Sequence, residues 1–466
     1  MPTVLSSRCS PLVHRDSALT YDEPAEGLRY DPASQVTQIL HQLTATSTQI
    51  NQADYLYNNV GNRTSLTDRR GAQSFGYDTL DRLTSASHPL LGTPQAFAYD
   101  PVGNRTTGGS VVNAGNQLTA DATHAYQYDD NGNLTRKTLL ATGNFTAYTY
   151  DAENRLTKVE EFAAGNPTAF ATSTYRYDGL GRRIEKVAPT GTKRYVYDGE
   201  DILLEYDGAN VLQARYTHGP GIDEPIAVTK GSSTFFYHQD GLGTVTDLTD
   251  STGTTAKSYS YDAYGNIVDQ TGTLEQPYTY TGREFDAETG LYYYRARYYD
   301  SVIGRFLQQD PINDAGFNQY SYADNLPVLF TDPTGLIAGP KAPRVKTRCN
   351  GSDDCSTLRG KIALLERTIR SHIGWDNHMP SPRGGGRHYE EISNWARALG
   401  RCVDIYNQKC QDCDKKKDEQ IQPQQVPLPL PSEVENASRY SEVEDAQEMR
   451  NIRQIRNLRF GFGRIP

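Results

Sequence analysis

Long apolar runs are absent from this sequence of 466 residues. No stretch approaches the roughly 18 consecutive apolar residues that a membrane-spanning helix requires, so we expect no membrane span. Residues 1–17 also lack the apolar segment that a secretory signal peptide carries. If the protein leaves the cell, we therefore expect another export route.

Cysteine and basic residues are scarce in the first 336 positions. Cys9 is the one cysteine there, and 25 Lys+Arg face 40 Asp+Glu, a net charge of −15. The remaining 130 residues hold 22 Lys+Arg against 17 Asp+Glu, or +5, and the two parts sum to the −10 of the whole chain. This change predicts a domain boundary near residue 337, in a chain too long for a single core. The other cysteines all follow that boundary: Cys349, Cys355, Cys402, Cys410 and Cys413.

A Tyr-Asp dipeptide followed by a Gly-Asn-Arg type of turn recurs through the first part, which holds 29 of the 32 tyrosines. Recurrence roughly every 20–30 residues is typical of stacked supersecondary units, none of which can bury its apolar face alone. The clearest copies are Tyr99–Thr106, Tyr128–Thr135, Tyr150–Thr157, Tyr177–Ile184 and Tyr261–Val268, with Tyr57–Thr64 as an early variant.

Each copy indicates a strand, a tight turn and a returning strand. Side chains alternate across Ala147–Asp151, Asn154 or a glycine permits positive φ at the turn, and Arg155–Val159 starts the return. We expect antiparallel hairpins stacked side by side. The tyrosine should pack between neighbouring strands, and the aspartate should cap the turn by accepting backbone N–H groups.

Beyond Tyr216 the repeat becomes more specialised, and its segments resemble a known family. They are Thr217–Ile226, Phe236–Thr246, Tyr280–Asp286, Gly290–Asp300, Gly304–Ile312 and Asp332–Leu336. Over roughly residues 20–336 the chain is similar to RHS-repeat (YD-repeat) proteins ending in the RHS-repeat-associated core. The resemblance implies a hollow shell of spiralling β-strands around a C-terminal toxin. Many members are polymorphic toxins delivered into competing bacteria or host cells, and teneurin-like relatives serve adhesion.

The expected fold class is therefore mainly β, with YD-repeat hairpins in a spiral sheet followed by a small α-helical domain. This chain has few repeats and no recognisable N-terminal delivery domain. The expected segments are a disordered or truncated start (1–20), the YD array (21–215), the RHS core (216–336), a linker (337–348), an α-helical hairpin (349–413), a Lys/Gln/Pro linker (414–431) and a terminal helix (432–466).

Two Asp-Pro pairs frame the end of the core, at Asp310 and Asp332. The resemblance implies that the core cuts itself here like an aspartic protease, with these aspartates as the dyad and the cut between Leu336 and Ile337. Two carboxylates that share a site do not both ionise easily, so one can activate water while the other donates a proton. Arg305 could orient a carboxylate. The alternative is that Asp-Pro only marks turns. We expect no cofactor and no metal.

The tail after Leu336 shows helical spacing in two stretches, from Leu358 to Ile373 and from Tyr389 to Cys410. An antiparallel hairpin would bring Cys355 near Cys410, so a disulfide is one expectation, with free thiols and a zinc site as alternatives. Polar residues around the interhelical loop could form a small nuclease site, or simply an exposed loop. They are His372, His378, Arg387, His388 and Glu391.

Two functional hypotheses follow. The first is a toxin C-terminus whose β-shell core cleaves itself and frees an α-helical effector for competition between bacteria. Its partners would be the enclosed tip itself, a cognate immunity protein, and nucleic acid for the basic tail. It would be secreted or on the surface of a bacterium, and its tail delivered into a target cell. The second is a non-catalytic YD-repeat surface or adhesion protein with a disulfide-pinned tail.

Overall fold

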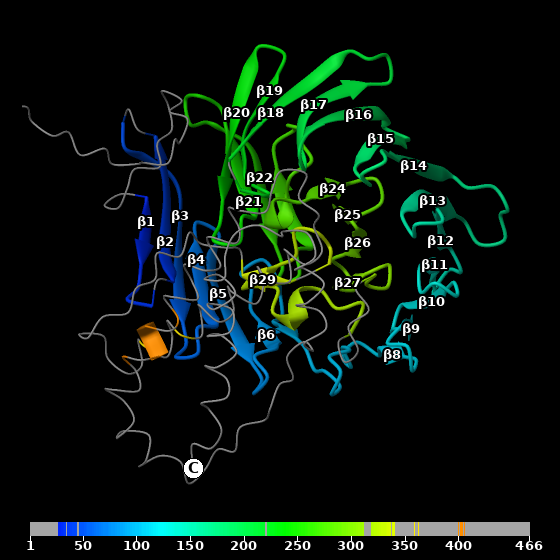
Figure 1. The fold of residues 1–466 in the computed structure, drawn as a ribbon, viewed down its shortest axis with the longest axis horizontal. Coiled ribbons are helices and arrows are strands. Elements are labelled where there is room, and N and C mark those ends of the chain that lie inside the picture. Colours follow the sequence, from blue (N-terminus) through cyan, green and yellow to red (C-terminus); the bar gives the residue numbers. More distant parts are fainter. Residues whose placement is uncertain are drawn as a thin grey trace, which may run out of the picture. The chain divides into compact units, whose positions relative to one another are not determined.

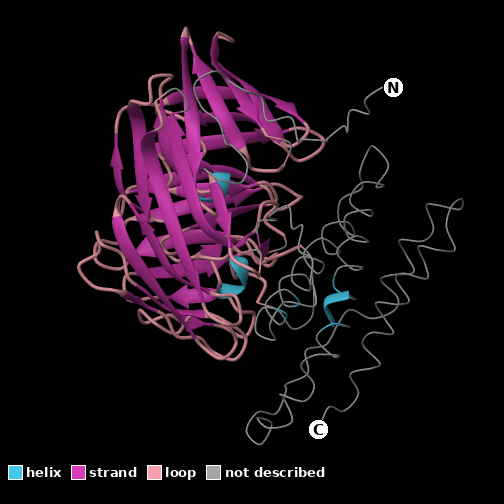
Figure 2. Ribbon diagram, turned by 90° about the vertical axis from the view of Figure 1, so that its left-hand side faces the viewer, coloured by secondary structure: helices cyan, strands magenta, loops and turns pink. Residues whose placement is uncertain are grey.

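Strands dominate the computed structural model (Figure 2). It describes residues 27–33, 35–43, 46–219, 221–311, 318–336 and 338–340, and helical positions at 358, 362, 399, 401–403 and 405. The sheets treated below belong chiefly to one compact unit, which includes Val36–Leu56 and Arg63–Lys341; Tyr30–Gln35 and Tyr57–Asn62 belong to a second. Within the described residues, no helix combines the length and the apolar run that crossing a membrane requires.

The largest sheet has sixteen antiparallel strands in strict chain order, from β8 to β23; Figure 1 shows β8 in cyan and β22 in green. Each strand thus pairs with its neighbours in the chain, which confirms the predicted stacking of hairpins. The strands are β8 (Val111–Val112), β9 (Leu118–Ala120), β10 (His124–Tyr128), β11 (Leu134–Leu139), β12 (Phe145–Tyr150), β13 (Leu156–Phe162), β14 (Ala171–Tyr177), β15 (Arg183–Ala188), β16 (Gly191–Asp198), β17 (Asp201–Asp207), β18 (Leu212–His218), β19 (Pro225–Lys230), β20 (Ser233–Gln239), β21 (Val245–Thr249), β22 (Thr255–Tyr261) and β23 (Ile267–Thr271).

The described strands form three smaller sheets as well, β1–β7, β24–β27 and β28–β29, and each keeps the chain order of its strands. Seven strands precede β8: β1 (Leu28–Tyr30), β2 (Val36–Leu43), β3 (Thr48–Tyr57), β4 (Arg63–Asp68), β5 (Gly71–Tyr77), β6 (Leu83–Ala86) and β7 (Gln95–Ala96). After β23 come η1 (Tyr280–Gly282), β24 (Glu284–Asp286), β25 (Leu291–Tyr294), β26 (Arg297–Asp300), β27 (Arg305–Phe306), η2 (Ala323–Asn325), β28 (Phe330–Thr331) and β29 (Gly339–Pro340). The strand β29 falls where a linker was expected.

The aspartate of each repeat caps its turn, as predicted. Oδ1 of Asp151 accepts the backbone N–H groups of Glu153 at 2.9 Å and Arg155 at 3.0 Å. Its Oδ2 accepts Nε of Arg155 at 2.7 Å. Asn154 adopts a φ of 59°, the left-handed backbone that asparagine tolerates better than most residues. In other copies, too, one Oδ1 accepts two hydrogen bonds, from the backbone N–H groups two and four positions further on. These aspartates are Asp78, Asp100, Asp129, Asp178, Asp207, Asp240 and Asp262.

The repeat tyrosine reaches back across the sheet. The hydroxyl of Tyr150 donates to the carbonyl of Leu134 at 2.8 Å, and that of Tyr177 donates to the carbonyl of Leu156 at 2.6 Å. The guanidinium of Arg155 lies over the Tyr177 ring, 5.1 Å from its centroid. Each copy is thereby bonded to the copy before it, a link that adds to the packing expected from the sequence. The pairing register shifts at these tyrosines, which indicates a β-bulge at each copy.

The four-stranded sheet β24–β27 is the buried core of the unit. Tyr292 and Tyr294 lie in one hydrophobic cluster, with residues such as Leu248, whereas Tyr293 lies in a second cluster with Leu156. Alternate side chains of β25 therefore pack on opposite faces, so both faces of this sheet are covered. The three tyrosine hydroxyls of β25 each have a hydrogen-bond partner, and that of Tyr292 donates to the carbonyl of Gly265 at 2.7 Å.

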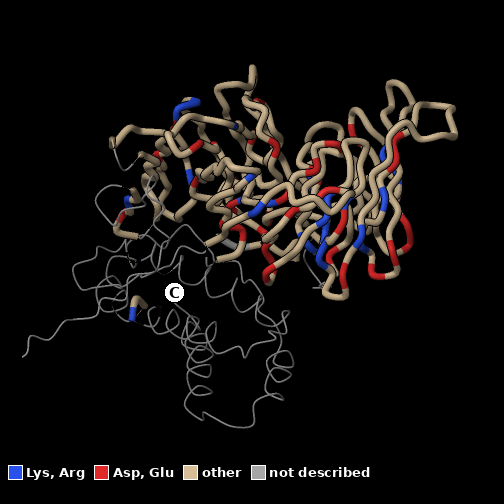
Figure 3. Tube along the Cα trace, turned by 90° about the horizontal axis from the view of Figure 1, so that it is seen from above, with Lys and Arg blue, Asp and Glu red and all other residues tan. Residues whose placement is uncertain are grey.

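Buried ion pairs fix this core sheet to the sixteen-stranded sheet. Arg183 of β15 binds Glu284 at 2.8 Å and also binds Asp286, and Lys186 binds Asp286 at 2.8 Å. All four residues are at least nine-tenths buried. Acidic and basic residues are interspersed along the described chain (Figure 3). Glu185 on β15 pairs with Arg194 on β16, and its Oε2 lies 2.7 Å from Nε of Arg194.

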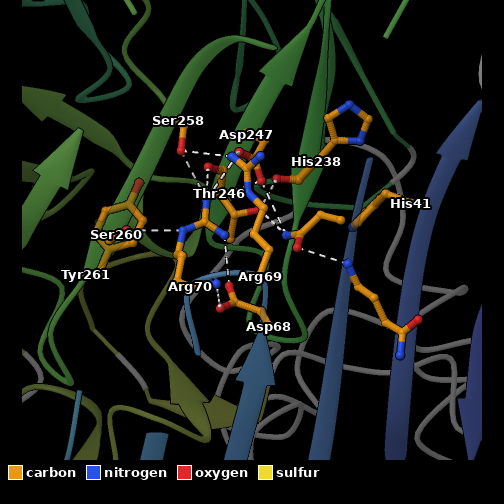
Figure 4. A network of polar contacts seen from close by, with 12 residues as sticks. His41, Asp68, Arg69, Arg70, His238, Thr246, Asp247, Ser258, Ser260 and Tyr261 are labelled. Atoms are coloured by element: carbon orange, nitrogen blue, oxygen red, sulfur yellow. Dashed lines mark hydrogen bonds and ion pairs between the residues drawn. The ribbon is translucent and has the colours of Figure 1, made fainter. Parts of the chain in front are cut away.

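A second polar network joins the seven-stranded sheet β1–β7 to β21 and β22 (Figure 4). Asp247 is fully buried and accepts bonds from Arg69, from Nη2 of Arg70 at 3.2 Å, and from Nδ2 of Asn51 at 3.3 Å. Beside it, Nε2 of His41 lies 2.9 Å from the carbonyl of Gln239. The His41 ring meets the His238 ring edge to face, with centroids 5.0 Å apart. Both imidazoles are buried in a region that already holds two arginines.

Acidification should weaken this network. Burial lowers the pKa of both His41 and His238, and the charges of His41 and Arg69 lower that of His238 further. The unfolded chain takes up these protons near its ordinary pKa of about 6.5, whereas the folded chain resists them, so stability is lost as the pH falls below about 6.5. We expect the urea midpoint to drop between about pH 7.5 and pH 5. Replacing both histidines by glutamine should flatten this dependence; an unchanged slope would contradict the assignment.

Candidate functional site

The two Asp-Pro aspartates converge on one guanidinium group. Asp310 follows β27 and Asp332 follows β28. Nη2 of Arg297 lies 2.9 Å from Oδ2 of Asp310 and 3.5 Å from Oδ2 of Asp332. Arg297 is the first residue of β26 and is buried. The two aspartates that the sequence singles out, 22 positions apart in the chain, therefore lie close together in space. The residue that binds both, Arg297, was not among the site residues expected from the sequence.

Arg297 has no idle donor nitrogen. Nη1 donates to the carbonyl of Gln319 at 2.9 Å, and Nε donates to the carbonyl of Gly335. Its guanidinium also lies over the Phe306 ring, 3.7 Å from the centroid. Burial lowers the pKa of Arg297, and the carboxylates of Asp310 and Asp332 oppose that change. An arginine stays protonated in proteins, so the two carboxylates share one positive charge.

Asp332 uses its two oxygens differently. Oδ2 faces Arg297, whereas Oδ1 accepts the backbone N–H of Leu336 at 3.0 Å and the hydroxyl of Thr334 at 3.4 Å. The bond to an N–H four positions on repeats what the YD aspartates do. Asp332 is thus a turn cap and a member of the acidic site at once. Its carboxylate lies beside Leu336, whose carbonyl belongs to the bond expected to be cut; Ile337 is outside the described residues.

The turn after Asp332 requires glycine. Gly335 has a φ of 72°, and a Cβ atom there would lie 2.4 Å from the carbonyl oxygen of Tyr294. Such a distance is shorter than real Cβ contacts, and the atom that it would meet is backbone. The glycine of Asp-Pro-Thr-Gly-Leu therefore lets the chain approach β25 closely.

A third aspartate belongs to this acidic group. The pKa of Asp324 is raised to about 6, first by the loss of hydration in the surrounding protein and then by the negative charges of Asp332 and Asp310. Asp324 is nonetheless exposed, whereas the other two residues of η2, Ala323 and Asn325, are buried. Its φ of 51° is unusual for a residue other than glycine. The sequence carries no motif at Asp324, and its proximity to the Asp-Pro pairs depends on the fold.

Arg305 does not take the role expected from the sequence. Its Nη1 lies 3.4 Å from Oδ1 of Asn104, and Nη2 donates to the carbonyl of Asn116. Its guanidinium also lies 5.4 Å from the centroid of the Tyr320 ring. Arg305 therefore contacts the repeats, while Arg297 contacts the carboxylates. The reason is geometric: the two arginines lie on neighbouring antiparallel strands of the core sheet, and the acidic residues approach only one of them.

The predicted tail residues lie outside the described residues. They are the disulfide candidates Cys355 and Cys410 and the polar residues His372, His378, Arg387, His388 and Glu391. Of the tail cysteines, Cys402 is described; it is buried in a helical segment and is disulfide-bonded. Across the described part of the chain, no group of three or more His, Cys, Asp or Glu side chains is arranged to hold a metal ion.

Comparison with known proteins gives consistent matches. The family model described as Teneurin YD-shell matches residues 17–328. The tRNA nuclease WapA of Bacillus subtilis is 36% identical over 282 residues, covering 56% of this chain and 12% of that protein. The double-stranded DNA deaminase toxin A of Burkholderia cenocepacia is 29% identical over 411 residues, covering 75% of this chain and 28% of that protein. This chain thus spans a small part of each relative.

Among solved structures, one described as "Crystal Structure of TcdB2-TccC3 without hypervariable C-terminal region" aligns with a TM-score of 0.48. Its sequence is 19% identical, and the alignment covers 66% of this chain and 18% of that one.

Replacing Asp324 by asparagine should stabilise the protein at neutral pH. Because the folded-state pKa of Asp324 is raised, the unfolded chain ionises first, and stability is lost as the pH rises from about 4 to about 6. Asp324→Asn should therefore raise the urea midpoint at about pH 7 and leave it unchanged near pH 4. An equal increase at both pH values would point instead to the tolerance of asparagine for left-handed backbone.

Proposed function

Because the chain belongs to the Teneurin YD-shell family, we propose that it is the C-terminal part of an RHS polymorphic toxin. Its β-shell core cuts the backbone between Leu336 and Ile337 and frees a small α-helical effector from residues 337–466. One observation carries the proposal: Arg297 binds Asp310 and Asp332 together, while Asp332 also accepts the N–H of Leu336. An acidic pair is thus assembled beside the expected cut.

The reaction is a hydrolysis that consumes one water molecule. An ionised carboxylate of the Asp310–Asp332 pair removes a proton from water, and the water oxygen bonds to the carbonyl carbon of Leu336. A protonated carboxyl donates to the amide nitrogen of Ile337 as the C–N bond breaks. The products are a carboxylate on Leu336 and an amino group on Ile337. Arg297 stabilises the negative charge that the ionised carboxylate of the pair carries.

A tethered substrate makes this modest arrangement sufficient. The bond to be cut lies in the same chain as the carboxylates, so no encounter is needed and the effective concentration is high. The bond from the N–H of Leu336 to Asp332 holds the neighbouring backbone in place. Each molecule holds one such bond, so the site needs to act only once and no turnover is required.

The proposed partners follow from the same reading. The shell encloses its own tip as cargo, and a cognate immunity protein protects the producing cell. Nucleic acid is the proposed target of the tail. In support, residues 337–466 carry a net charge of +5 (22 Lys+Arg against 17 Asp+Glu), and the two relatives named above act on tRNA and on double-stranded DNA by name. The protein is exported from a bacterium, and its tail enters a target cell.

Self-cleavage is tested by the intact mass of the purified full chain. The wild-type protein should appear as two species that divide after Leu336. Asp310→Asn and Asp332→Asn should each leave one full-length species, because amides neither remove a proton from water nor carry the negative charge that Arg297 binds.

Asp130→Asn is the matched control, since this exposed turn aspartate lies in the repeats. It should cut as the wild type does. A folded wild-type protein that stays whole would contradict self-cleavage and favour the non-catalytic surface protein.

The effector role is tested by inducing residues 337–466 inside bacteria. Growth should stop, and tRNA or DNA isolated from the cells should show breaks or altered bases. The variant with His372, His378 and His388 replaced by alanine should restore growth if the polar loop carries the activity. Unchanged growth with the wild-type tail, expressed at a verified level, would favour a structural cap.

A further inference from the structure

The turn between β25 and β26 holds the chain that leads to the proposed cut. Tyr294 pairs with Arg297, so the two residues between them form a tight hairpin turn. Three successive carbonyls of the Asp-Pro-Thr-Gly-Leu segment accept bonds from three successive residues of the hairpin. The pairs are Nη1 of Arg295 with Pro333, the backbone N–H of Ala296 with Thr334 at 3.1 Å, and Nε of Arg297 with Gly335.

The backbone of Arg295 is unusual for its residue type. Its φ is 58°, in the left-handed region. A two-residue hairpin turn with positive φ at the first central position normally takes glycine there, because a side chain is disfavoured. This chain places an arginine at that position and accepts the strained backbone. Such strain, kept at one defined place in a fold, is a reason to look for a role of the side chain.

Two acidic residues, Asp223 and Glu200, hold the guanidinium of Arg295 in place. Nη2 donates to Oδ1 of Asp223 at 3.0 Å, and Nε lies 3.4 Å from Oε2 of Glu200. Asp223 is buried and also binds Arg283. Burial acts to raise the pKa of Asp223, but the two guanidinium groups of Arg283 and Arg295 lower it overall. Asp223 thus stays ionised and fixes the direction in which Arg295 presents its remaining N–H groups.

We propose that Arg295 is a positioning residue for self-cleavage. Anchored by Asp223, it holds the carbonyl of Pro333 and so sets the register of Pro333–Leu336 against Asp332. The inference rests on the proposed function, because it assigns a role within that reaction.

A purely structural role predicts a different result. Glycine suits the backbone at this position better than arginine does, so removing the side chain should relieve strain in the hairpin. If Arg295 served the fold alone, through its ion pairs, its loss would lower stability in proportion to any loss of cutting. A positioning role predicts that loss of the side chain lowers the rate of cutting and leaves the stability of the fold unchanged or higher.

The test compares Arg295→Gly with the wild type in the full chain. The rate of cutting is followed by cell-free synthesis with a labelled pulse, and samples are quenched over time. We expect Arg295→Gly to cut about 10- to 100-fold more slowly, the loss typical of a displaced reacting group. Its Tm should equal or exceed that of the Asp332→Asn variant, which serves as the uncut reference. Millimolar guanidinium chloride should speed cutting in Arg295→Gly and leave the wild type unchanged.

Ser47→Gly is the matched control. Ser47 is exposed, has a φ of 54° and lies in the turn between β2 and β3, so the change relieves the same backbone conformation at another place. It should cut at the wild-type rate. Arg295→Lys, which keeps the charge without the planar fork, should fall between wild type and Arg295→Gly.

The outcomes separate the two proposals. A wild-type chain that stays whole overturns the proposed function itself. A wild-type chain that divides, with Arg295→Gly dividing at the same rate, overturns the positioning role alone. Slow cutting combined with a lowered Tm and no response to guanidinium also overturns it, because that pattern belongs to a structural residue.

Discussion

Burial of the tyrosine-rich sheet β24–β27 on both faces is the constraint on which the rest of the unit depends. Alternate tyrosines of β25 enter two separate hydrophobic clusters, and Arg183 and Lys186 bind the sheet from β15. Arg297, which gathers the acidic residues, is part of this sheet. The cation of the candidate site therefore lies on a packed strand, which gives the aspartates that follow β27 and β28 a well-defined partner.

Much of the architecture was predictable because it is local. The aspartate caps, the positive φ at Asn154 and the antiparallel stacking depend on residues within one or two hairpins, so the repeat itself contains the information. The position of the repeat tyrosine was predictable only in part. Its packing between strands was expected, but the hydrogen bond from the Tyr150 hydroxyl to the Leu134 carbonyl was not. The early hairpins meet β21 and β22 through Arg69, Arg70 and Asp247, nearly 180 positions apart, and no repeat pattern signals that contact.

The candidate site was predictable to the same extent and no further. Asp310 and Asp332 stand out by motif, and they share a cation in the structure. Arg297 could not be told from Arg305 by sequence, because both lie in short, buried strands and differ only in which neighbours the fold supplies. Asp324 carries no motif at all. Its raised pKa arises from surrounding protein and from the charges of residues that only tertiary structure assembles.

The pairing of β28 with β29 bears on what a cut would accomplish. Phe330 faces Pro340 and Thr331 faces Gly339, so Leu336 lies in the loop of a short hairpin. Hydrolysis in that loop would leave a nicked hairpin, with its two arms still side by side. The covalent bond would be gone, yet separation would wait on the loss of contacts that a short ladder makes only weakly. Breaking the chain and parting from the product would thus be two events with different controls, the first chemical and the second mechanical.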